Sequence, residues 1–250
     1  MKQDTTNETI ERVPLLEAQE CMRIHNQVHE LRSHWILRDG ANFYSLGAVL
    51  YLDAPVPETV SQFKLEPPGK DTYRRHVEKY NPILERHFAP LYEHVAKALA
   101  SALGAAVRYT SGLGLPGFHI YQHAPDYSRQ ATQVPHYDRQ YECIEWGDHP
   151  DIDFTAAVSF TFAICLPADG GGLRIWDLDL FEVLALEHEA AKQLAKRAPW
   201  RIHDYVVGEL VYHRGHLLHQ IAKWKSVPGD ERITLQGHGL FYDGCWNLYW

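Results

Sequence analysis

Apolar side chains recur at helical spacing in two long stretches of the N-terminal half. Between residues 15 and 37 they fall three or four positions apart, and Asp39-Gly40 then forms a turn signal. The second stretch begins at Asn81-Pro82, where Asn suits a helix cap and Pro suits the first turn, and it ends at Gly104. The pattern therefore predicts two long amphipathic helices.

The segments around these helices have other patterns. Residues 1–13 are mostly polar and are expected to form a mobile tail. Residues 43–52 are largely apolar, which predicts a strand or a buried irregular segment. We expect residues 14–110 to be mainly a helical support for the C-terminal half of the chain.

Beyond Gly117 the pattern changes to short apolar or alternating runs separated by Gly- and Pro-rich turns. Seven or eight such strands predict an antiparallel double-stranded barrel or jelly roll over residues 117–242. A helix-like insertion at about 181–197 interrupts them, either as a lid at the mouth or as a plain surface excursion. The expected fold is α+β, with a helical buttress and a cupin-like barrel in one domain, 14–250.

Composition and charge narrow the function. The 250 residues carry a net charge of −8, which disfavours a nucleic-acid substrate and a membrane partner. The N-terminus has no secretory pattern, and no run reaches the ~18 apolar residues of a membrane span. The four cysteines lack metal-type spacing and indicate reduced thiols of a cytoplasmic protein.

A His-x-Asp tripeptide, His136-Tyr137-Asp138, is the first candidate for chemistry. In an extended segment the two ligating side chains share one face, and the composition stays extended from Arg139 to Ile144. One imidazole and one carboxylate are two thirds of the triad that holds non-haem Fe(II). A second copy, His149-Pro150-Asp151, lies among turn formers and is expected to be a surface loop.

The third ligand must be a distant histidine. His213 and His216 flank the tight turn Arg214-Gly215, whereas His219 opens an extended segment. His219 is therefore the preferred ligand, with His213 or His216 as alternatives.

An arginine and a hydroxyl lie further along the chain at strand spacing. Arg232 and Thr234 are two residues apart, so on a strand they share a face. An arginine beside a hydroxyl is a good clamp for a carboxylate, because the guanidinium gives paired, charge-assisted hydrogen bonds.

Together these residues resemble the Fe(II)/2-oxoglutarate-dependent oxygenase superfamily. The resemblance covers about residues 117–242 and includes the Gly170-Gly171-Gly172-Leu173 and Gly208-Glu209-Leu210-Val211 segments. It implies a double-stranded β-helix and decarboxylation of 2-oxoglutarate to succinate with O₂, coupled to oxidation of a second substrate. It also implies the site residues: His136, Asp138 and His219 for iron, and Arg232 and Thr234 for the distal carboxylate of 2-oxoglutarate.

The expected reaction is hydroxylation, or another oxidation such as desaturation, of a small molecule such as an amino acid or a natural-product intermediate. Related halogenases have a small residue in place of the carboxylate ligand, so Asp138 argues against halogenation. The alternatives are an oxygenase of a peptide or carrier-bound substrate and a barrel that binds metal or ligand without turnover.

Strand parity extends the predicted site to neighbouring side chains. Tyr121 is expected to hydrogen-bond 2-oxoglutarate, and the other residues are expected to face the substrate or to form the pocket walls, with ordinary barrel packing as the alternative for each. These further residues are His119, His123, Gln140, Trp176, Trp224, Gln236, His238 and Trp246.

Overall fold

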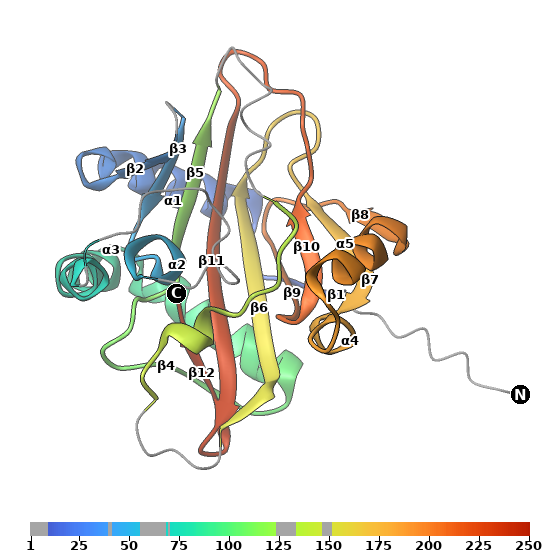
Figure 1. Ribbon diagram of the computed structural model, residues 1–250. Helices are drawn as coiled ribbons and strands as arrows, with labels where there is room; N and C mark the ends of the chain where they lie inside the picture. Colours follow the sequence, from blue (N-terminus) through green and yellow to red (C-terminus); the bar gives the residue numbers. More distant parts are fainter. Residues whose placement is uncertain (1–9, 40–41, 56–68, 70, 124–133, 147–151) are drawn as a thin grey trace, which may run out of the picture.

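Two sheets, antiparallel except for the parallel pair β4 and β12, form the centre of the protein in a computed structural model (Figure 1). The structure describes residues 10–39, 42–55, 69, 71–123, 134–146 and 152–250. The large sheet follows the order β1-β9-β6-β11-β5-β3-β2, with β12 paired to β11 and β4 paired to β12, and the small sheet follows the order β10-β7-β8. The strands of the large sheet are β1 (Ile10–Pro14), β2 (Ile36–Asp39), β3 (Phe43–Leu46), β4 (Ala106–Tyr109), β5 (Gly117–Gln122), β6 (Asp153–Cys165), β9 (Glu209–Arg214), β11 (Glu231–Tyr242) and β12 (Cys245–Tyr249). The strands of the small sheet are β7 (Leu173–Asp179), β8 (Trp200–His203) and β10 (Leu217–Ile221).

The predicted jelly-roll architecture is confirmed, although the two sheets do not join into one closed barrel among the described strands. An isolated β-bridge pairs His136, which lies outside both sheets, with His219 on β10 of the small sheet. A cavity lies between the sheets, because its lining comes from β6, β9 and β11 on one side and from β7 and β10 on the other.

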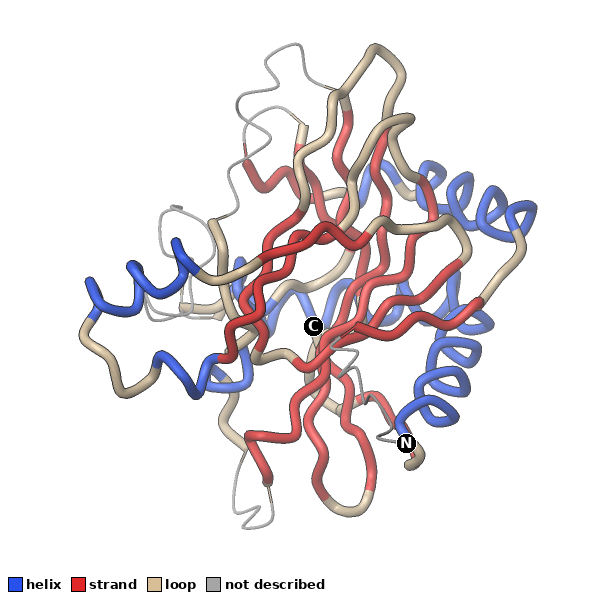
Figure 2. The backbone as a smooth tube through the Cα atoms, turned by 90° about the vertical axis from the view of Figure 1, so that its right-hand side faces the viewer, coloured by secondary structure: helices blue, strands red, loops and turns tan. Residues whose placement is uncertain are grey.

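Helices cover the opposite face of the large sheet. Helices α1 (Ala18–Glu30) and α3 (Thr72–Leu103) bury their apolar stripes in the main core together with Phe118, Phe162 and Leu235. Helical segments accordingly lie toward the margin of the molecule, and strands run through its centre (Figure 2). This packing leaves the inner face of the sheet for polar side chains.

Helix α3 begins earlier than the sequence indicates. Asn81-Pro82 was expected to start it, but the helix runs from Thr72 through both Pro82 and Pro90. Phe88 departs from helical geometry at φ −126°, two residues before Pro90, because a proline ring crowds the preceding turn and produces a kink. The predicted stop is confirmed, since Gly104 adopts the left-handed conformation at φ 68°.

The other N-terminal predictions need correction. The first helix ends at Glu30; Leu31 and Trp35 flank a short 3₁₀ turn (Arg32–His34), and the apolar residues after it belong to β2. The segment 43–52, expected to be a strand or a buried irregular segment, divides into β3 and the short helix α2 (Leu50–Asp53). Residues 10–13 of the predicted tail pair with β9 as part of β1, and the rest of that tail lies outside the described residues.

The segment that carries His136 is also less regular than predicted. It makes one β-bridge in place of a strand, and Gln140–Cys143 form a 3₁₀ turn where extended backbone was expected. The expected insertion is present as α4 (Leu180–Val183) and α5 (His188–Arg197), between β7 and β8. Within the described part of the chain, no helix has the length and apolar character needed to cross a membrane.

Candidate metal centre

His136, Asp138 and His219 lie together at the cavity between the sheets. Their ligand atoms all lie within 4.8 Å of one another, and the Asp138 carboxylate is 3.3 Å from His219 Nε2 and 3.9 Å from His136 Nε2. Backbone hydrogen bonds hold this geometry: His136 and His219 exchange two of 3.0 Å, and the Asp138 N–H donates to Gly215 O over 2.9 Å. The three side chains can therefore bind one ion.

Both imidazoles are fixed in the form that a metal requires. His136 Nδ1 lies 2.9 Å from Val134 O, and His219 Nδ1 lies 2.8 Å from Leu217 O. A carbonyl oxygen can only accept, so each Nδ1 carries the proton and each Nε2 presents a lone pair toward Asp138.

The charges of the cluster agree with this assignment. Burial lowers the pKa of His219 to about 4 and also lowers the pKa of His136, although the Asp138 carboxylate opposes both shifts. Burial raises the pKa of Asp138, but the surrounding imidazoles outweigh it and hold that pKa below its ordinary value. At neutral pH the cluster therefore offers two neutral imidazoles and one carboxylate, the protonation states of metal ligands.

Gln140 supports the carboxylate. Parity predicted that it would face the substrate, but its side chain is fully buried outside the cavity lining and its Nε2 donates to Asp138 Oδ1 over 3.0 Å. A hydrogen bond of this kind fixes the orientation of a carboxylate that binds a metal.

Replacing Gln140 by Leu is expected to weaken Fe(II) binding by about 10–100-fold, because Asp138 loses the donor that orients it. Competition with a coloured chelator under anaerobic conditions measures the affinity. Gln193→Leu, at an exposed position of α5, is the matched control. Equal Fe(II) affinities in the two variants would show that Gln140 does not support the metal site.

Arg232, near the start of β11, lines the same cavity as the triad. It is only 1% exposed; its Nε donates to Gly171 O over 2.8 Å and its Nη1 donates to Thr234 Oγ1 over 3.2 Å. The rings of Tyr205 and Tyr121 lie 5.6 and 5.9 Å from its guanidinium carbon. In the described part of the chain this buried cation thus contacts neutral groups, and it faces a cavity that can admit an anion.

Of the other predicted side chains on β5 and β11, two line the cavity and two lie outside its lining. Gln236 and His238 line the cavity, and His238 Nδ1 lies 3.7 Å from the Asp138 carboxylate. His119 lies behind the lining, where its Nε2 is 2.9 Å from the Tyr51 hydroxyl, and Tyr121 stacks on Phe43 at 4.4 Å.

The predicted pocket walls are largely elsewhere. Trp176 packs with Leu178 and Leu218 in a separate apolar cluster, and Trp246 packs on Phe241. Neither of these tryptophans contributes to the lining of the cavity. Trp224 packs against Tyr121, and His123 Nδ1 lies 2.8 Å from Ser226 Oγ. The second tripeptide, His149-Pro150-Asp151, lies outside the described residues.

His213 and His216 were the alternative ligands. His216 points to the Tyr141 hydroxyl at 3.0 Å, away from the triad. His213 lines the cavity with its ring 4.8 Å from that of His219, so it neighbours the triad without joining it.

Sequence reasoning missed several lining residues. Tyr51, Ser159 and Tyr205 contribute to the cavity from α2, β6 and the segment before β9. Ser159 and Tyr205 occur in runs with strand-like composition, where parity could have indicated them; Tyr51 belongs to a short helix that no periodicity revealed.

No protein-family model matches the sequence, and no curated protein matches it. In structure the chain is similar to an N-substituted L-amino acid dioxygenase from Burkholderia ambifaria, at 14% identity and TM-score 0.52 over 96% of this chain and 86% of that one. It is also similar to HygX from Streptomyces hygroscopicus with nickel and 2-oxoglutarate bound, at 12% identity and TM-score 0.50 over 92% and 82% of the two chains. A third similar structure is the non-haem α-ketoglutarate-dependent epimerase SnoN from nogalamycin biosynthesis, at 12% identity and TM-score 0.50 over 94% and 81%. The chain therefore has the double-stranded β-helix fold that the sequence predicted.

Proposed function

We propose that this chain is an Fe(II)/2-oxoglutarate-dependent dioxygenase that hydroxylates a C–H bond of a small molecule. The observation that carries the proposal is the joint geometry of one cavity: two fixed Nε2 lone pairs and a carboxylate converge on one point, and a buried guanidinium faces the same space. The first set suits Fe(II), and the second suits the distal carboxylate of 2-oxoglutarate.

The donor set fits iron. Two imidazoles and one carboxylate on one side leave the remaining coordination positions open, as the facial triad of non-haem iron oxygenases does. When bound, Fe(II) supplies the redox chemistry that couples O₂ and decarboxylation of 2-oxoglutarate to oxidation of the second substrate.

The residues around the triad have separate tasks. Asp138 brings a negative charge that offsets the metal, and Gln140 keeps its carboxylate oriented. Arg232 binds the far carboxylate of 2-oxoglutarate while Gly171 O holds its Nε in place, and the Thr234 hydroxyl adds a contact. The low exposure of Arg232 and Thr234 excludes water from this clamp and strengthens each charged hydrogen bond.

The substrate is inferred from the polar lining. Gln236, His238 and Tyr51 can hydrogen-bond a small polar molecule, which agrees with an amino acid or a natural-product intermediate. The similar structures include an amino acid dioxygenase and an epimerase, so one fold serves more than one outcome. Hydroxylation is proposed over halogenation because Asp138 fills the carboxylate position.

The test is an anaerobic titration of the metal-free protein with Fe(II) and then with 2-oxoglutarate. We expect a weak visible charge-transfer band on addition of 2-oxoglutarate, because a 2-oxo acid that chelates the bound iron gives such a band. Iron binding without the band would contradict the shared site. If the band appears, a screen of small molecules, with succinate release as the measured signal, would identify the second substrate.

Replacing Arg232 by Lys is expected to raise the KM for 2-oxoglutarate about 10–100-fold. The point charge of lysine cannot reproduce the two-pronged guanidinium, and a charged hydrogen bond contributes about 1.5–3 kcal/mol. Succinate formation at varied 2-oxoglutarate measures the effect, with exposed Arg201→Lys on β8 as the control. An unchanged KM for 2-oxoglutarate would show that Arg232 does not bind the co-substrate.

A further inference from the structure

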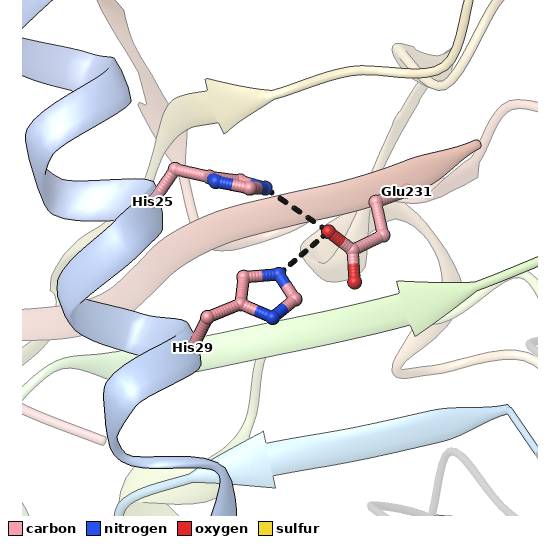
Figure 3. Close-up of side chains that lie close together, drawn as sticks. All are labelled: His25, His29 and Glu231. Carbon is pink, nitrogen blue, oxygen red and sulfur yellow. Dashed lines mark hydrogen bonds and ion pairs between the residues drawn. The ribbon is translucent and has the colours of Figure 1, made fainter. Parts of the chain in front are cut away.

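A second cluster of metal-ligating side chains lies on the opposite face of β11, between that strand and α1 (Figure 3). It consists of His25, His29 and Glu231, here named the outer histidine cluster. His25 and His29 are four residues apart on α1, so their side chains lie on one face of the helix, one turn apart. Glu231 opens β11 and points toward both rings.

The distances are close to those of a bound metal. Glu231 Oε2 lies 3.0 Å from His25 Nε2 and 2.8 Å from His29 Nε2, and all ligand atoms of the cluster lie within 4.8 Å of one another. Ligand atoms at about 2.0–2.1 Å from a tetrahedral zinc lie about 3.3 Å apart. The two distances from Glu231 Oε2 to the histidines therefore need to widen by only a few tenths of an ångström to match a tetrahedral zinc site.

The carboxylate is held in the orientation that the site needs. Gln122 Nε2 donates to Glu231 Oε1 over 2.9 Å, which leaves Oε2 directed at the imidazoles. The support of a ligating carboxylate by such a hydrogen bond is a common feature of metal sites. The histidine side chains are 29% and 31% exposed and that of Glu231 is 13% exposed, so an ion can enter from solvent.

We propose that the outer histidine cluster is a second metal site, which binds a zinc-like divalent transition-metal ion through His25 Nε2, His29 Nε2 and Glu231 Oε2. Two histidines at i and i+4 on a helix with a carboxylate from another element are a typical zinc ligand set, and three protein ligands leave a fourth position for water. With Nε2 of each imidazole on the ion, the proton of that ring would be on Nδ1. Asn26 Oδ1, 3.4 Å from His25 Nδ1, is placed near one of these protons.

The ion would tie α1 to the sheet beside the co-substrate clamp. Glu231 and Arg232 are adjacent on β11, and successive side chains of a strand point to opposite faces. A metal bound only by the folded chain stabilises it in proportion to the logarithm of the metal concentration over the dissociation constant. The site does not depend on the proposed oxygenase reaction, because its ligands lie outside the cavity lining.

The test counts zinc ions on the full chain by equilibrium dialysis with elemental analysis, after the triad has been disabled by Asp138→Ala with His219→Ala. We expect about one equivalent of Zn²⁺ to remain and to raise the thermal unfolding midpoint. Adding His25→Ala and His29→Ala should remove both the equivalent and the shift. Gln122→Ala should keep the site but weaken it about 10–100-fold.

Controls separate the site from general binding by histidines. His94→Ala, at an exposed position of α3, should leave the zinc equivalent unchanged. If the chain with a disabled triad binds no zinc, or binds it equally after loss of His25 and His29, the proposal is wrong. Single His29→Gln serves if the double variant does not fold. Failure of the iron titration at the triad would leave this result unaffected.

Discussion

Replacing Asp138 by Ala is expected to reduce succinate formation to background and to weaken Fe(II) binding by more than about 100-fold. Loss of a residue that only supports a ligand costs up to about 100-fold in metal affinity, and loss of a ligand should cost more. The carboxylate lies between both imidazole Nε2 atoms, so its loss leaves two neutral ligands that cannot offset the charge of the ion. Its removal also frees the Gln140 amide, which then has no carboxylate to orient. Iron affinity and 2-oxoglutarate-dependent succinate release are the two measurements.

Two further variants make the Asp138 result specific. Asp177→Ala removes an exposed carboxylate of β7 and should leave iron binding unchanged. Asp138→Asn keeps the size and one oxygen but not the charge, so it should retain more iron affinity than Asp138→Ala while remaining far below the unmutated chain. Full activity in Asp138→Ala would show that the metal is bound by other residues, with His213 and His238 as the nearest candidates.

The sequence predicts much of the site because its parts obey local rules. Two-residue spacing brings His136 next to Asp138 and Arg232 next to Thr234, and both pairs do share a face in the structure. The parity argument succeeds even where the backbone is not a strand, since one β-bridge to His219 is enough to extend the chain at His136. Whether these residues bind iron and 2-oxoglutarate stays a prediction.

The parts that sequence reasoning missed depend on contacts between distant segments. The Gln140 side chain reaches back to the Asp138 carboxylate because a 3₁₀ turn interrupts the extended backbone. Composition alone did not indicate that turn. Trp176 lies on the side of β7 that packs with Leu218, which only the pairing of β7 with β10 determines. The start of α3 was misplaced because tertiary packing overrides the local preference of Asn81-Pro82 for a helix start.

A buried ion pair supports the helix that carries Tyr51 to the cavity. Arg38 binds Asp53 through two hydrogen bonds of 2.5 and 2.9 Å, and the side chains are 6% and 1% exposed. The Val49 N–H also donates to Asp53 over 2.8 Å, and His76 Nδ1 lies 3.1 Å away. This network connects β2, α2 and α3 around a single carboxylate.

Burial raises the pKa of Asp53, but the neighbouring His76 and Arg38 side chains outweigh it and hold the pKa below its ordinary value. A carboxyl group with a lowered folded-state pKa stabilises the fold above its unfolded pKa of about 3.9. This contribution is lost as the pH falls from there through the folded-state pKa. The loss of stability in acid should therefore be smaller in a variant that lacks Asp53.

Replacing Asp53 by Ala is expected to lower the free energy of unfolding by about 3–5 kcal/mol, because Arg38 is left as an unpaired buried charge. Urea unfolding at neutral pH measures the loss, and Glu78→Ala, which breaks an exposed pair with Arg74, should cost less than about 1 kcal/mol. Removing Arg38 as well, in Asp53→Ala with Arg38→Leu, should recover part of the stability, since the unpaired charge is gone. A loss in Asp53→Ala no larger than in Glu78→Ala would mean that water reaches Arg38 readily. The network would then not be what holds Tyr51 at the cavity.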